Sequence, residues 1–167
     1  QEATIMAHVG VHSNLVSLVG VVTSGTPLLL VISLCEHGSL KSQLEKRALG
    51  IGKLVARPGA LPPKLDSCLA QEIAQGMQHL VTNNMVHRDL AARNILLDSQ
   101  LVAKVADFGL SRAFSGESDY YKSATGMMAL RWTAPEAMTT LKFSMKTDVC
   151  VYIFLSTGGA VCALHSV

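Results

Sequence analysis

The spacing of apolar residues changes along the chain, and this spacing predicts the secondary structure. Between positions 64 and 83, apolar residues recur every three or four positions: Leu65, Leu69, Ile73, Met77 and Leu80. Side chains at this spacing lie on one face of an α-helix. The pattern therefore predicts a long amphipathic helix that packs against a core. Residues 2–9 (EATIMAHV) also have a helix-forming composition, and Gly10 ends that run.

Strand-forming runs come in two pairs, and each pair is separated by turn-forming residues. Residues 16–23 and 28–34 are rich in valine and leucine and flank Ser24-Gly25-Thr26-Pro27. Residues 95–97 and 101–105 flank Asp98-Ser99-Gln100. Aliphatic runs joined by such turns predict two antiparallel hairpins.

A helix and a loop are expected between these pairs. Ser39 is a favourable N-cap, which predicts a helix over about residues 40–48. Residues 49–63 (LGIGKLVARPGALPP) carry three Gly and three Pro, a composition typical of a loop. They include Gly50-Ile51-Gly52-Lys53, but the spacing of a phosphate-binding G-x-x-x-x-G-K-[ST] loop is absent. We therefore expect a solvated loop.

Composition adds a broad class. The chain has 167 residues, of which 49% are apolar and 16% are charged, as in one globular domain. A net charge of +2 is too small to indicate nucleic acid or an anionic membrane as a partner. The cysteines show no C-x-x-C spacing and are expected to be reduced thiols: Cys35, Cys68, Cys150 and Cys162. This indicates the cytosol or the cytoplasmic part of a membrane protein.

The strongest chemical signal is the stretch 87–109, HRDLAARNILLDSQLVAKVADFG. It contains Asp89, then Asn94, then Asp107 at the start of Asp-Phe-Gly. H-R-D-L-x-x-x-N followed by D-F-G is the pattern of the protein-kinase catalytic loop. Either motif alone is a weak signal, whereas both in this order and at this distance make a strong one. The chain thus resembles the middle of a protein kinase domain, from Glu2 to about Val149.

Two segments resemble the tyrosine-kinase group in particular. Asp89 is followed by Leu90-Ala91-Ala92-Arg93-Asn94, where serine/threonine kinases usually place a lysine two residues after the aspartate. Residues 130–136 (LRWTAPE) are similar to the tyrosine-kinase version of the segment that ends in A-P-E. The resemblance implies transfer of a phosphoryl group from ATP, with Mg²⁺, to tyrosine hydroxyls of protein substrates. An ordinary α+β domain with chance motifs does not explain both segments.

Phosphoryl transfer depends mainly on positioning and charge neutralisation. By resemblance, Asp89 accepts or orients the proton of the substrate hydroxyl. Asn94 and Asp107 supply oxygen ligands that suit Mg²⁺. Arg93 is expected to meet the transferred phosphoryl group or the carboxylate network around it.

The resemblance also implies an adenine pocket. Its gatekeeper would be Ile32, its hinge Ser33, Leu34 and Cys35, and its floor Leu96. Ala106, just before the Asp-Phe-Gly, would leave room for the nucleotide. Hinge backbone groups would bind the adenine edge. Taken without the resemblance, Ile32 and Leu96 are as well explained as strand residues that pack in a core.

Four residues are expected to pair with the ATP-anchoring lysine or to align the two lobes: Glu2, Met6, His87 and Phe108. Glu2 matches the glutamate that pairs with the lysine, and the others match a stack of buried side chains. Taken only as residues, Glu2 is a solvated charge, and His87 and Phe108 are core.

Residues 107–136 resemble an activation segment, and they include Tyr120 and Tyr121. A phosphate on either tyrosine would pair with Arg88 or Arg112 and order the segment. The alternative is two exposed loop tyrosines.

The expected fold class is α+β, a truncated protein-kinase-like fold with a partial upper-lobe hairpin and a mainly helical lower lobe cut off within its central helix. Residues 1–35 would be upper lobe and hinge, and residues 36–148 lower lobe. Residues 149–167 contain no charged side chain and depart from the kinase pattern. Translated non-coding sequence or a splice variant explains such an apolar tail, and a membrane span is the alternative.

The 167 residues contain neither a G-x-G-x-x-G loop nor a V-A-I-K lysine, and we expect no secretory signal at their start. Two hypotheses follow. One is a cytoplasmic protein tyrosine kinase, free or on the cytoplasmic side of a membrane receptor, with protein substrates and no nucleic acid partner. The other is a truncated, inactive kinase fragment that acts at most as a binding module. We expect the 167 residues alone to bind ATP weakly and to have negligible activity.

Overall fold

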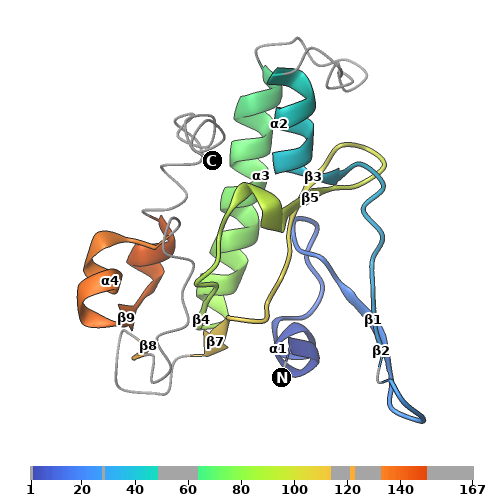
Figure 1. The fold of residues 1–167 in the computed structure, drawn as a ribbon, viewed down its shortest axis with the longest axis horizontal. Coiled ribbons are helices and arrows are strands. Elements are labelled where there is room, and N and C mark those ends of the chain that lie inside the picture. The colour runs from blue at the N-terminus through green and yellow to red at the C-terminus, as the bar shows by residue number, and fades with distance from the viewer. Residues whose placement is uncertain (1, 28, 49–63, 114–120, 123–132, 150–167) are drawn as a thin grey trace.

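The computed structural model describes residues 2–27, 29–48, 64–113, 121–122 and 133–149. It mixes helices and short strands, which confirms the expected α+β class (Figure 1). In chain order the elements are α1 (Glu2–Val9), β1 (Leu18–Val22), β2 (Leu29–Ile32), β3 (Gly38–Ser39), α2 (Leu40–Ala48), α3 (Lys64–Thr82), β4 (Met85–Val86), η1 (Ala92–Asn94), β5 (Ile95–Leu97), β6 (Ala103–Val105), β7 (Arg112–Ala113), β8 (Tyr121–Lys122), α4 (Pro135–Thr140) and β9 (Lys142–Phe143).

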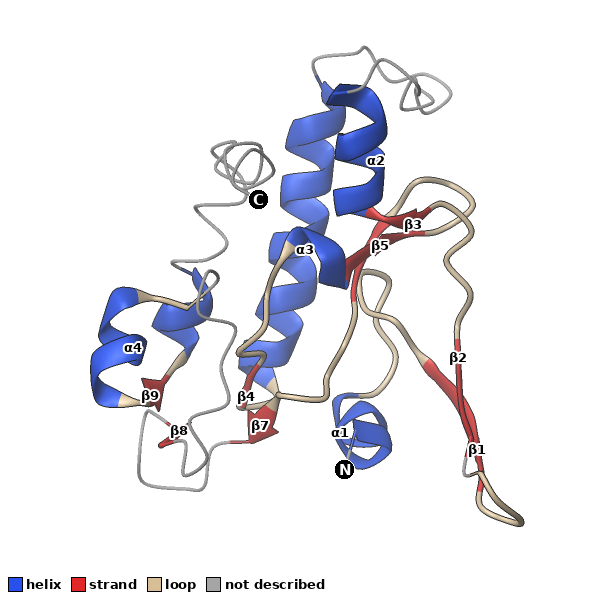
Figure 2. Cartoon of the chain, in the orientation of Figure 1, coloured by secondary structure: helices blue, strands red, loops and turns tan. Residues whose placement is uncertain are grey.

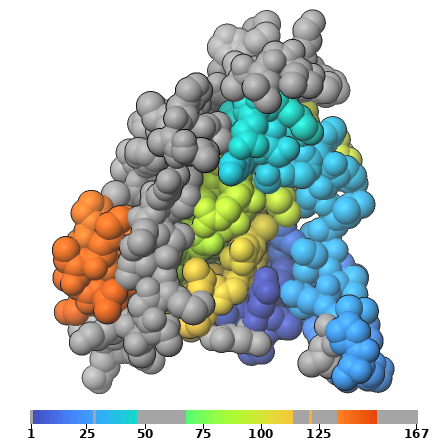
Figure 3. All heavy atoms as spheres, viewed as in Figure 1, coloured from blue at the N-terminus to red at the C-terminus, as the bar shows by residue number. Residues whose placement is uncertain are grey.

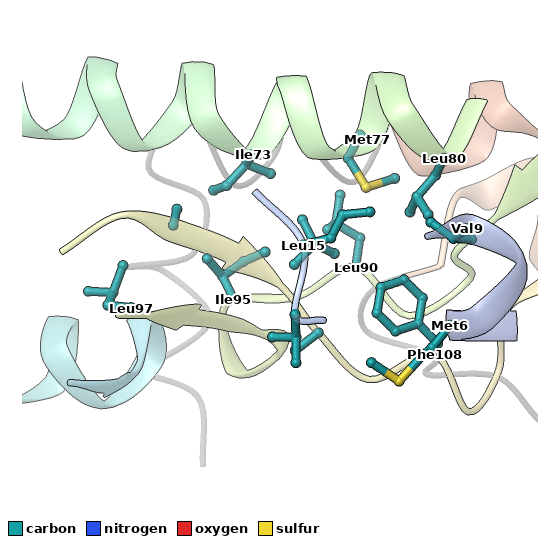
Figure 4. Close-up of a cluster of buried hydrophobic side chains, with 14 of the residues drawn as sticks. Met6, Val9, Leu15, Ile73, Met77, Leu80, Leu90, Ile95, Leu97 and Phe108 are labelled. Atoms are coloured by element: carbon teal, nitrogen blue, oxygen red, sulfur yellow. The ribbon is translucent and has the colours of Figure 1, made fainter. Parts of the chain in front are cut away.

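The long amphipathic helix is present as α3, and its predicted apolar face is buried from Leu69 onward; the side chain of Leu65 lies outside the described ones. Leu69, Ile73, Met77 and Leu80 all belong to the main core. In Figure 4, Ile73, Met77 and Leu80 point from α3 toward Leu15 and Leu90. At Gly76 the helix α3 lies close to the backbone of Asn14, because an added Cβ would stand 2.6 Å from the Asn14 oxygen. A glycine is therefore required for this packing.

The first predicted hairpin is β1 paired antiparallel with β2, with Leu18 opposite Ile32 and Val22 opposite Leu29. Both strands are shorter than the apolar runs that predict them. The hairpin projects from the body formed by the helices and the sheet, and much of its apolar surface stays exposed (Figures 2 and 3). Val19, for example, is 69% exposed.

The second predicted hairpin, β5 with β6, is part of a three-stranded sheet in the order β3-β5-β6, in which β5 is the central strand. β6 packs against α3, and Val105 is fixed on both of its backbone groups. Its N–H donates to the oxygen of Asn14, and its oxygen accepts from the N–H of Val16, each at 2.9 Å. The segment after α1 is thereby attached to the strand that leads to Asp107.

The predicted N-cap of α2 is confirmed, since the Ser39 hydroxyl accepts the backbone N–H of Ser42 at 3.2 Å. The predicted loop over 49–63 lies outside the described residues. A second, smaller core joins β4 to α4 and β9: Val86, Ala134, Ala137 and Phe143.

Candidate active site

The three catalytic residues predicted in the 87–94 loop lie together around one carboxylate. Asp89 is 7% exposed, and its Oδ1 forms an ion pair with the guanidinium of Arg93. Its Oδ2 accepts a hydrogen bond from Asn94 Nδ2 at 2.9 Å. The same Nδ2 donates to the backbone oxygen of Asp89 at 2.7 Å. Two side chains thus fix the direction of the Asp89 carboxylate.

Asn94 keeps its amide oxygen for another role, because Nδ2 makes both hydrogen bonds to Asp89. Asn94 ends the short helix η1, and its backbone oxygen accepts the N–H of Ala106 at 2.8 Å. Ala106 directly precedes Asp107 in sequence. This bond therefore brings the two predicted metal ligands, Asn94 and Asp107, to the same edge of the β5–β6 hairpin.

Asp107 is exposed and adopts a left-handed backbone conformation, with φ of 64°. This region costs a non-glycine residue about 1–2 kcal/mol. The N–H of Gly109 donates to Asp107 Oδ1 at 3.3 Å and closes a tight turn. The turn directs the carboxylate outward while the next side chain, Phe108, is buried.

His87 and Phe108 contact each other inside the molecule. Their ring centroids lie 5.7 Å apart, and both side chains are buried. His87 Nε2 lies 3.0 Å from the backbone oxygen of Ala106, so it is the donor of that bond, and Nδ1 accepts the N–H of Asp89 at 3.3 Å. Met6 belongs to the same core and lies beside Phe108 in Figure 4. Three predicted alignment residues are therefore brought together.

Glu2 lies in the first turn of α1 and is partly exposed. Its pairing with an ATP-anchoring lysine stays a prediction.

Asp148 is a site residue that the sequence analysis did not identify. Its carboxylate is buried beneath the catalytic loop, where Oδ2 accepts the N–H of His87 at 2.7 Å and Oδ1 accepts the N–H of Arg88 at 3.0 Å. Burial raises the pKa of Asp148, while the backbone N–H donors of His87 and Arg88 oppose this rise. Its position just before the uncharged stretch 149–167 is the one signal that the sequence offers.

The predicted nucleotide-binding residues lie near the junction of β2 with the body. Ser33 joins the predicted hinge to Ser17, since its N–H donates to the Ser17 oxygen at 2.9 Å and its hydroxyl accepts the Ser17 N–H at 3.0 Å. Ile32 is 43% exposed, so its alternative role as a core residue is wrong. Cys35 and Leu96 pack against the main core, and Ala106 is part of it. Leu34 is 76% exposed.

Two arginines meet one of the predicted regulatory tyrosines. The Cζ atoms of Arg88 and Arg112 lie 4.9 Å and 5.9 Å from the ring centroid of Tyr121. Arg88 also lies 4.4 Å from the ring of Phe143, the residue opposite Tyr121 in the β8–β9 pair. Burial, followed by the charge of Arg112, lowers the pKa of Arg88. Tyr120 lies outside the described residues.

The donor set at this edge suits a hard cation. Asn94 and Asp107 offer an amide oxygen and a carboxylate, which are ligands that Mg²⁺ prefers. Within the described ranges, no group of three or more His, Cys, Asp or Glu could hold a metal ion. An ion bound here would therefore use the oxygens of Asn94 and Asp107 together with oxygens from outside the protein.

A sequence model of the family described as protein tyrosine and serine/threonine kinase matches residues 1–156. The chain belongs to this kinase family. Its elements are accordingly those of a protein-kinase-like α+β fold. The match includes part of the segment 149–167, whose structure lies outside the described residues, and the boundaries at 35 and 148 stay predictions.

Receptor kinases are among the similar curated proteins. The chain is 43% identical to ephrin type-A receptor 7 of Gallus gallus over 152 residues, which cover 90% of this chain and 14% of the receptor. It is 35% identical to fibroblast growth factor receptor 1 of Dugesia japonica over 154 residues, which cover 91% of this chain and 18% of the receptor. The chain therefore spans less than a fifth of these relatives. None of its helices, as far as they are described, has the length and apolar character needed to cross a membrane.

Proposed function

We propose that the chain forms part of the catalytic domain of a protein tyrosine kinase, which transfers a phosphoryl group from ATP to tyrosine hydroxyls of protein substrates. One observation carries the proposal: Asp89 is held by Arg93 and Asn94 beside the turn that carries Asp107. Tyrosine specificity is supported by Ala91-Ala92-Arg93 and by the similarity to the two receptors.

In this proposal Asp89 receives the proton of the attacking hydroxyl. Its carboxylate is suited to the task because Arg93 and Asn94 hold it in one direction. Arg93 is exposed on one side and can face an incoming phosphate or substrate carboxylate while it contacts Asp89. The His87 and Arg88 backbone, fixed by Asp148, keeps the loop in place.

Asn94 and Asp107 would hold Mg²⁺ through their oxygens. When bound, the ion neutralises charge on the phosphates. The adenine would lie against the hinge backbone at Ser33 and Cys35, next to Ile32, Leu96 and Ala106. Glu2 would pair with the ATP-anchoring lysine, and Met6, His87 and Phe108 would align the lobes.

We further propose regulation by phosphorylation of Tyr121 or Tyr120. The two arginines beside Tyr121 support this, because a phosphate there would find two guanidinium partners. We place the protein in the cytoplasm or on the cytoplasmic side of a membrane receptor. The free thiols of Cys35 and Cys68 suit a reducing compartment, and the names of the relatives favour a receptor.

A second candidate is an inactive fragment that serves at most as a binding module. The exposed apolar side chains of the β1–β2 hairpin favour this candidate, because such a surface promotes association.

A phosphotransfer assay with labelled ATP and a tyrosine-containing polymer tests the enzyme proposal. It should use the longest protein that contains these residues. Asp89→Asn should lower the rate by about 10²–10⁴-fold, the usual contribution of a general base. Glu45→Gln is the control, since Glu45 forms only an exposed surface pair with Lys41. An unchanged rate in Asp89→Asn, or product found only on serine and threonine, would contradict the proposal.

A further inference from the structure

Two imidazole rings stack where the segment after α1 crosses α3. The ring centroids of His12 and His79 lie 4.7 Å apart, and the ring planes are inclined by 23°. Both side chains are partly buried. His79 comes from the last turns of α3, whereas His12 lies in the segment that joins α1 to β1. The pair therefore connects two elements that are far apart in sequence.

The hydrogen bonds of the two rings define which nitrogen carries the proton. His12 Nδ1 lies 3.1 Å from the backbone N–H of Asn14 and must accept from it. The neutral ring of His12 consequently carries its proton on Nε2, and an added proton has only Nδ1 to occupy. His79 Nε2 lies 2.9 Å from the backbone oxygen of Val9 and must donate to it. An added proton on His79 would go to Nδ1 and leave this bond intact.

The two histidines therefore respond differently to acid. His79 can become a cation without losing its contact with α1. His12 cannot, because its protonation removes the acceptor of the Asn14 N–H and places a positive charge beside Lys104 and the ring of His79. Asn14 also supports β6 through Val105, so the lost bond lies at the junction of three elements.

The charges around His12 act in the same direction. His79 faces it from α3 and Lys104 from β6, and both disfavour a cation. The carboxylate of Asp98 is paired with Lys104 at 3.4 Å, and that of Glu72 accepts the N–H of Ala103 at 2.8 Å. Burial first, then His79 and Lys104, lower the pKa of His12 below its ordinary value of 6.5.

We propose that the stacked His12–His79 pair is a proton-sensitive latch, which holds the segment after α1 against α3 and opens when His12 takes up a proton. The sign follows from linkage. The unfolded or opened segment binds a proton at His12 more readily than the closed one, so the closed form loses stability as the pH falls below 6.5.

Amide hydrogen exchange of the whole chain at about pH 5.5 and about pH 7.5, on either side of the ordinary histidine pKa, tests the latch. Rates must be divided by the intrinsic rate at each pH to give protection factors. Protection of residues 9–14 should fall about fivefold at the lower pH, the factor that corresponds to the loss of one hydrogen bond. His8→Gln is the control, since His8 is an exposed histidine of α1 and its replacement should leave this fall unchanged.

Two variants separate the latch from a merely structural role. His12→Asn offers its side-chain oxygen to the Asn14 N–H but does not titrate, so its protection should be the same at both pH values. His79→Gln keeps a donor for the Val9 oxygen but removes the imidazole that disfavours the His12 cation, so the acid-induced fall in protection should be smaller than in the parent. Circular dichroism at about pH 7.5 shows which variants are folded. The proposal would be overturned if the protection of residues 9–14 did not fall at the lower pH in the parent. It would also be overturned if protection fell equally in the parent and in a folded variant.

Discussion

Asp148 Oδ2 accepts the backbone N–H of His87 at 2.7 Å, although 61 residues separate the two in sequence. The carboxylate also accepts a hydrogen bond from the N–H of Arg88. One buried side chain therefore provides the acceptor for two successive backbone N–H groups, those of His87 and Arg88. The loop that presents Asp89 is therefore held by Asp148, a residue that follows residues 107–136 in the sequence.

Replacing Asp148 by alanine should leave both of these donors without their acceptor. Each unsatisfied buried donor costs about 1–3 kcal/mol, so we expect Asp148→Ala to destabilise the chain by roughly 3 kcal/mol. Urea unfolding followed by circular dichroism measures the change. Lys146→Ala, at an exposed position two residues earlier, is the control and should alter the free energy of unfolding by less than about 0.5 kcal/mol. A similar small effect for both variants would contradict the assigned role.

Gly76→Ala should also destabilise the chain, although alanine is the better helix former by about 1 kcal/mol. The new Cβ would stand 2.6 Å from the Asn14 oxygen and also close to Leu15 and Val105. Since the nearest atom belongs to the backbone, α3 must move, and we expect a net loss of about 1–3 kcal/mol. Thermal unfolding tests this, with Gln71→Ala on the exposed face of α3 as the control. A higher melting temperature for Gly76→Ala would contradict the close approach of α3 to the Asn14 backbone.

Tyr121→Phe should preserve the unphosphorylated structure, because the ring that contacts Arg88 and Arg112 remains. The variant cannot accept a phosphate, however. Treatment with an active tyrosine kinase should raise the melting temperature of the parent and leave that of Tyr121→Phe unchanged, since a phosphate there would pair with the two arginines. Phosphopeptide mass spectrometry distinguishes Tyr121 from Tyr120. Phosphate found at Tyr120 alone, with the same stabilisation in both proteins, would assign the role to the neighbouring residue.

The exposed apolar residues of the β1–β2 hairpin should promote self-association. Val19 and Leu29 are 69% and 51% exposed, and a two-stranded sheet has open edges. We expect the double variant Val19→Thr, Leu29→Thr to remain monomeric at concentrations at which the parent associates. Sedimentation velocity over a range of concentrations measures this. Met138→Thr changes an exposed apolar residue of α4 and should behave like the parent. Identical association of all three proteins would show that the hairpin is not the surface through which the chain self-associates.

The periodic apolar pattern predicted α3, which ends at Thr82, one residue before the predicted limit. Helix-forming composition predicted α1 and the Ser39 N-cap predicted α2, and the boundaries of both agree with prediction. Two-residue strands such as β4 and β7 have no period to detect, and they form because β7 returns to β4 after the Asp-Phe-Gly turn. Local sequence cannot reveal such pairings, because they depend on the tertiary path of the chain.

The contacts within the proposed catalytic cluster were predictable because its members lie close in sequence and form a known pattern; their catalytic roles stay a proposal. Asp89, Arg93 and Asn94 contact one another as neighbours within a single loop. Asp148 was missed because its partners are backbone N–H groups, which leave no mark on the sequence. The His12–His79 stack was missed for a related reason: neither residue belongs to a motif, and only the crossing of the joining segment over α3 brings their rings together.

The double attachment of Val105 has a mechanical consequence. Its backbone is bonded to Asn14 and Val16 on one side, and two residues later the chain reaches Asp107. Residues 14–16 are therefore coupled by two backbone hydrogen bonds to the strand that leads into the Asp-Phe-Gly turn. We expect a bound partner that displaces residues 14–16 to act on the Asp107 turn through these backbone hydrogen bonds, without contacting it.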